Sequence, residues 1–76
     1  MNLREASAIA RRHIADVFAS DAPHDIRLEN FLYDDHLMVW SLTVGFEPKH
    51  GQHGRLCKLV CVSSANNAVL FVGDAP

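Results

Sequence analysis

The sequence predicts an α+β domain in which one N-terminal helix packs on one face of a four-stranded antiparallel meander, in the order α-β-β-β-β. Apolar side chains recur at three- and four-residue spacing in the first part of the chain, which is typical of an amphipathic helix. Beyond about residue 25, apolar and polar residues alternate with a period of two, which is typical of strands. The 76 residues make one small domain, 1–76.

The helix is expected to run from Leu3 to about Ser20. Asn2 precedes it and Glu5 follows three residues later, the arrangement of a capping box. Asp21-Ala22-Pro23 ends the helical pattern. The apolar stripe consists of Leu3, Ala6, Ala10, Ile14 and Val17.

The first strand is expected from Asp25 to Tyr33. Its alternation slips after Leu28, because Phe31 and Tyr33 follow at an odd spacing. A β-bulge near Asn30 would return these apolar residues to one face. Asp34-Asp35 then reads as a short polar turn.

Three further strands are predicted: His36–Phe46, Arg55–Ser63 and Ala68–Val72. The segment 47–54 contains a proline and two glycines and is expected to be a loop. The turn 64–67 contains two asparagines, and Asn tolerates a positive φ there.

Alternation within the second strand divides the sheet into two faces. We expect the helix to cover Met38, Trp40 and Leu42, with Trp40 at the centre of the core. An apolar set is left on the far face, joined by Leu70 or Val72 according to the register of the last strand. That set consists of Leu37, Val39, Ser41, Cys57, Leu59 and Cys61.

The far face predicts a protein interface, because monomers rarely leave a large apolar patch exposed. The partner is expected to be a second copy of the chain, forming a homodimer, or another protein that this one inhibits. The alternative is that bulges exchange the faces locally and the long loop folds under the sheet.

The charge balance gives no electrostatic footprint for nucleic acid, since seven basic and nine acidic residues leave a formal charge of −2. No apolar run is long enough for a membrane span or a signal peptide. Cys57 and Cys61 lie about 13 Å apart along one strand, at about 3.3 Å per residue, which is too far for a disulfide. Free thiols suit a reducing cytoplasm.

His50, His53 and Cys57 are spaced as donors that zinc accepts, with Glu47 as a possible fourth. The alternative is a solvated glycine-rich loop, since structural zinc sites usually carry paired cysteines. No phosphate loop, nucleophile elbow or zinc-protease motif occurs. The sequence therefore predicts a protein without catalytic residues or cofactor, with a zinc site in this loop as the alternative.

The strand "VWSLTVGF" and the later "CKLVCVSSANNAVLFV" resemble a group of short bacterial α+β proteins with a PepSY-like or cystatin-like layout. In these, a W-x-x-T-x-x-F-type strand precedes a Y-K-x-F-x-V-D-x-x-x-G-x-V hairpin. The sequence departs from this pattern at Leu56 and Cys57, at Ser63 in place of an acidic residue, and at Asn67 in place of glycine. The resemblance implies a small binding or inhibitory module. The matching positions are Trp40, Thr43, Phe46, Lys58, Val60, Val62 and Val69.

Overall fold

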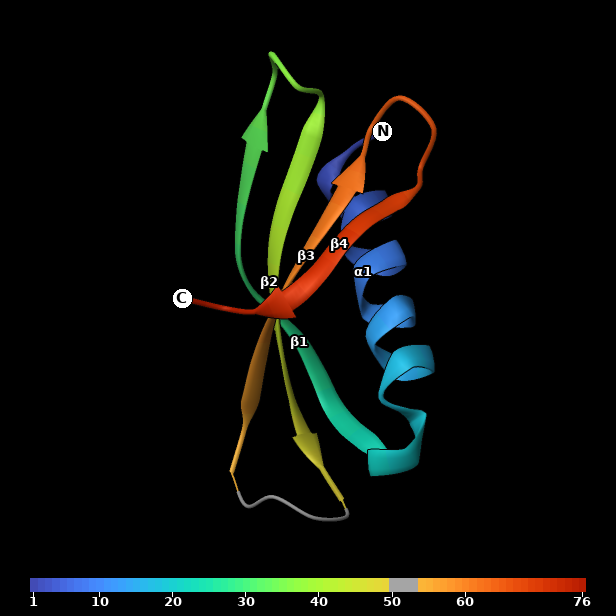
Figure 1. Cartoon of the computed structure of the whole chain (residues 1–76), viewed down its shortest axis with the longest axis vertical. Coiled ribbons are helices and arrows are strands. Elements are labelled where there is room, and N and C mark those ends of the chain that lie inside the picture. The colour runs from blue at the N-terminus through green and yellow to red at the C-terminus, as the bar shows by residue number, and fades with distance from the viewer. Residues whose placement is uncertain (50–53) are drawn as a thin grey trace.

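Figure 1 shows the computed structural model of the chain, which describes residues 1–49 and 54–76. The strands pair antiparallel in the order β1-β2-β3-β4, and α1 runs along one side of the sheet. The predicted α-β-β-β-β arrangement is confirmed. The elements are α1 (Leu3–Val17), the 3-10 turn η1 (Ala19–Asp21), β1 (Pro23–Asp34), β2 (Val39–Pro48), β3 (Leu56–Ser63) and β4 (Val69–Asp74).

The capping box at the start of α1 is confirmed. The Glu5 backbone N–H donates to the Asn2 side chain at 2.9 Å, and the Asn2 N–H donates to Glu5 Oε1 at 3.1 Å. The helix ends at Val17, earlier than predicted, and Ala22 at a φ of 48° turns the chain into β1. Among the described residues, no helix has the length and apolar character needed to cross a membrane.

The core lies between α1 and the two central strands. Alanines at positions 6 and 10 let the helix backbone approach the sheet closely, and Ile14 fills the space nearer its end. The predicted phase of the strands is confirmed, because alternate residues of β2 and β3 are fully buried under α1. The buried apolar residues are Ala6, Ala10, Ile14, Leu42, Val44, Phe46, Val60 and Val62.

Trp40 faces the helix side as predicted, but its expected place at the centre of the core is wrong. It is only half-buried and packs against the core from the margin. Its ring lies 4.7 Å from the Tyr33 ring and 6.4 Å from the Phe31 ring, measured between centroids. Its buried Nε1 has no acceptor among the described residues. The core centre lies further along β2, where the middle of α1 passes over the sheet.

The predicted bulge in β1 is confirmed by a register shift between Leu28 and Asn30. A second shift, between His24 and Arg27, was not predicted. Asp25 lies within it at a φ of 52°, a left-handed conformation that Asp tolerates better than most residues.

The β1–β2 turn is longer than predicted, so three residues assigned to the second strand, His36, Leu37 and Met38, lie outside it. Asp34 Oδ1 accepts hydrogen bonds from the backbone N–H groups of His36 (2.9 Å) and Leu37 (3.0 Å). Met38 follows at a φ of 56°, and regular pairing starts only at Val39. Leu37 and Met38 are therefore exposed in the turn instead of lying on opposite sheet faces.

The β3–β4 turn supports this strained backbone. The Ser64 backbone N–H and hydroxyl both donate to the Met38 carbonyl oxygen, at 2.9 and 3.1 Å. The Tyr33 hydroxyl lies 3.1 Å from Ser64 Oγ. Asn67 has a φ of 61°, which confirms the positive φ predicted for this turn.

Two leucines on neighbouring strands provide a test of the core. Leu42→Ala removes a fully buried side chain and is expected to lower the free energy of unfolding by about 2–5 kcal/mol. Leu32→Ala removes a side chain that is 69% exposed and should change it by no more than about 0.5 kcal/mol. Urea denaturation of both variants measures the difference, and equal losses would contradict the assignment of the faces.

Candidate functional site

The sheet face turned away from α1, called here the open face, is not covered by any described helix or strand (Figure 1). It is defined by the odd-numbered residues 39–45 of β2 and 57–63 of β3, which alternate with the buried core residues. Directly paired residues on neighbouring strands share a face. The register therefore extends the open face onto β1 and β4.

One row of side chains crosses the whole open face. Leu32 of β1 pairs with Ser41, Ser41 pairs with Cys61, and Cys61 pairs with Phe71 of β4. Leu32 is 69% exposed and Phe71 is 52% exposed, whereas Ser41 and Cys61 are half-buried between them. The row thus has large apolar side chains at its two ends and small ones in its middle.

The Phe71 ring leans along β4 over Gly73. A Cβ atom at Gly73 would lie 2.5 Å from the ring Cζ and 2.8 Å from Cε2. Only glycine leaves room for the ring in this position. Phe71 therefore covers the β4 margin over two positions of the strand.

The structure brings five of the six predicted interface residues onto the open face. Val39, Ser41, Leu59 and Cys61 are half-buried there, and Cys57 is exposed. Leu37 does not join them, because it lies in the β1–β2 turn and is 71% exposed.

The two large, exposed apolar side chains at the edges of the open face, Leu32 and Phe71, were missed from the sequence. Leu32 follows the β1 bulge, so continued alternation from Phe31 and Tyr33 could have identified it. On β4, a register shift leaves Leu70 without a partner on β3, and Phe71 occupies the open face. Of the two residues expected here, Val72 packs against the core instead, whereas Leu70 is exposed at the register shift.

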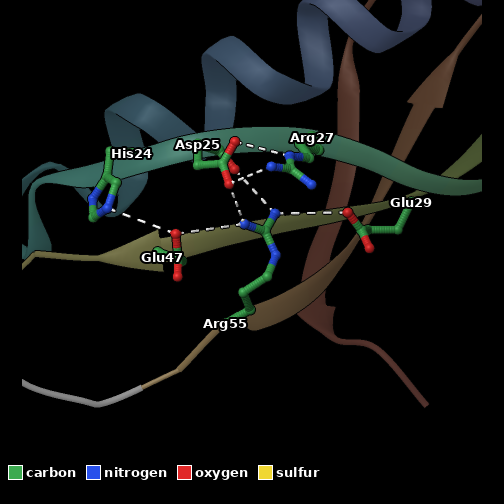
Figure 2. Close-up of polar contacts among 6 residues, drawn as sticks. All are labelled: His24, Asp25, Arg27, Glu29, Glu47 and Arg55. Atoms are coloured by element: carbon green, nitrogen blue, oxygen red, sulfur yellow. Dashed lines mark hydrogen bonds and ion pairs between the residues drawn. The ribbon is translucent and has the colours of Figure 1, made fainter.

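A network of charged residues lies at the end of the open face nearest the β2–β3 loop (Figure 2). Arg55 Nη1 donates to Asp25 Oδ2 at 2.9 Å, and Nη2 donates to the Asp25 carbonyl oxygen at 3.0 Å. Glu29 (3.6 Å) and Glu47 (3.9 Å) complete the carboxylates around this guanidinium. Arg27 Nε also donates to Asp25, at 2.8 Å.

This network holds the second bulge of β1 to the start of β3. The Arg27 hydrogen bond is the largest cause that lowers the pKa of Asp25, and the nearby Arg55 charge lowers it further. A Cβ atom at Gly45 would lie 3.0 Å from Glu29 Cγ and 3.1 Å from Arg55 Nη2. The charged side chains therefore lie directly across the β2 backbone and end the apolar part of the open face.

The cysteines are free, as predicted. Ser41 Oγ and Cys61 Sγ lie 3.7 Å apart and hydrogen-bond to each other. The predicted metal donors His50 and His53 fall outside the described residues. Within 1–49 and 54–76, no three His, Cys, Asp or Glu side chains are placed to hold a metal ion.

The charged network predicts a specific loss of stability in acid. The pKa of Asp25 is lowered in the folded chain, so its carboxylate stabilises the fold above its ordinary pKa of 3.8 and loses this contribution as the pH falls through the lowered value. Asp25→Asn is therefore expected to lower Tm at pH 7, with the difference from wild type shrinking below pH 4. Asp16→Asn, whose carboxylate has no ion pair with any described residue, is the control in thermal melts. A difference for Asp25→Asn that stays constant across this range would contradict the role of the network.

No family model, curated protein or solved structure matches this chain. The PepSY-like and cystatin-like resemblance therefore stays a prediction.

Proposed function

We propose that this chain is a non-enzymatic protein-binding module whose open face docks a protein partner. The observation that carries the proposal is the row from Leu32 to Phe71, in which two large apolar side chains are more than half exposed at the ends of an uncovered sheet. Half-buried Val39, Leu59 and Cys61 lie between these two residues on the same uncovered face, and contiguous apolar surfaces of this kind commonly mark binding sites.

Binding in place of catalysis is supported by the chemistry of this face. Its two candidate nucleophile-bearing residues at the centre, Ser41 and Cys61, hydrogen-bond to each other. The nearby carboxylates are held by Arg27 and Arg55. The described part of the open face encloses no cavity for a small substrate. These features suit a broad contact with another macromolecule.

The consequence proposed for the partner is inhibition or protection, as the resemblance to small bacterial binding modules implies. A module of this size blocks a site by occupying it and needs no chemistry of its own. Free thiols at Cys57 and Cys61 favour a reducing compartment, for which the cytoplasm is our proposal.

Two neighbouring residues of β3 separate binding from folding. Leu59→Ser alters the open face and is expected to leave Tm nearly unchanged while weakening capture of a partner from host cells, or self-association in sedimentation. Val60→Ser alters the fully buried neighbour and is expected to lower Tm substantially. The proposal fails if Leu59→Ser retains every contact of the wild-type protein, or if it unfolds the chain as Val60→Ser does.

A further inference from the structure

Most side chains in the middle of the open face are smaller than those at its two margins, which are formed by the edge strands β1 and β4. The middle strands present Val39, Ser41 and Thr43 from β2, facing Ser63, Cys61 and Leu59 from β3. Of these, only Leu59 matches the margin residues in size. Leu32 stands at one margin, and the Phe71 ring covers the other.

The spacing of these margins suits a single helix. Strands β1 and β4 are separated by three inter-strand steps, or about 14 Å at the usual spacing. An α-helix with its side chains is about 10–12 Å across. The stretch from Val39 to Gly45 is about 20 Å long at the usual rise per residue, which corresponds to about 13 residues of helix.

A second copy of the open face fits this profile less well. If two such faces were centred on each other, Leu32 and Phe71 of one would meet margin residues of the other, and the small middle residues would face a gap. If the two copies were shifted sideways, one margin of each open face would pack against the middle strands of the other, but half of each face would stay uncovered. Sheet-on-sheet packing requires interdigitating side chains across the whole contact.

The chain already covers its other face in the way proposed here. There α1 lies over β2 and β3, with Ala6, Ala10 and Ile14 packed against the central strands. On that face the sheet supplies mostly large residues, and the helix approaches it closely through two alanines beside Ile14. On the open face the middle residues are mostly small, so a visiting helix would supply the large ones.

The two ends of the open face differ in charge. At the β1–β2 turn, Asp34 and Asp35 bring two carboxylates. Among the described residues, the only basic side chain within ion-pair distance of either is the exposed His36 imidazole, 3.8 Å from Asp35, which carries charge only when protonated. At the other end, the carboxylates are already paired with Arg27 and Arg55. Positive charge on a partner is therefore favoured at the turn end.

We infer that the occupant of the open face is an amphipathic helix of another protein, with large apolar residues at i, i+3, i+4 and i+7 and Lys or Arg at the end that reaches Asp34 and Asp35. This inference rests on the proposed function and names the class of partner. The apolar side chains fill the middle between Leu32 and Phe71, and the basic end pairs with the turn.

The test uses a displayed library of random 16-residue peptides selected on the full chain, which allows helical and extended binders to compete equally. Selected peptides are expected to show the helical apolar spacing with a basic end. Leu32→Glu should weaken their affinity by about tenfold or more, the loss expected when a large apolar anchor is removed. Asp35→Lys should weaken it by a few-fold in a salt-dependent way. Ala8→Glu, on the exposed side of α1, is the matched control and should leave affinity unchanged.

The outcomes separate the two proposals. Selected peptides that carry apolar residues at every second position, or that lack a basic end, and that still bind more weakly to Leu32→Glu would overturn the inferred amphipathic helix with its basic end. Such peptides would keep the open face as the binding surface. A wild-type dimer in sedimentation that Leu32→Glu dissociates would do the same and identify a second copy as the occupant. Binders insensitive to Leu32→Glu, or no binders at all, would overturn the inference, and the insensitive binders would also contradict the proposed function. Circular dichroism of each variant, with the wild-type spectrum expected, establishes that the losses are not unfolding.

Discussion

The sheet has two faces, and α1 covers only one of them. The rest of the structure depends on this constraint. The helix covers one face, where the central residues of β2 and β3 are fully buried, whereas the open face has mostly half-buried side chains in its middle and the exposed Leu32 and Phe71 at its edges. Domains of this size hide a smaller fraction of their surface than larger ones. The composition of the open face decides what it can bind.

Much of the fold follows from local pattern. The capping box at Asn2, the strand phase that buries Leu42, the bulge before Asn30 and the positive φ at Asn67 were all predicted, because each depends on residues close together in sequence. The turn after β1 was not, since the Asp34 side chain captures two backbone N–H groups that would otherwise join the strand. Whether a side chain competes with strand pairing in this way depends on the local backbone geometry, which the alternation of apolar and polar residues does not indicate.

The site was predictable in part for the same reason. Val39, Ser41, Leu59 and Cys61 follow from alternation within single strands. Phe71 depends on the register between β3 and β4, which the shift at Leu70 changes by one residue, and a one-residue change exchanges the faces. The Arg55 network depends on a second bulge that brings Asp25 to the start of β3. Neither long-range feature has a signature in the sequence near it.

The two register shifts in β1 also affect how the protein behaves at high concentration. An outer strand with regular unpaired backbone groups invites the strand of another molecule, and repeated pairing of this kind builds fibrils. In β1 the shifts interrupt that regular spacing twice. At the opposite edge, β4 is six residues long and carries a shift of its own. Each edge of the sheet thus offers a short template, so a chain that exposes an apolar face is protected against growth by edge-to-edge addition.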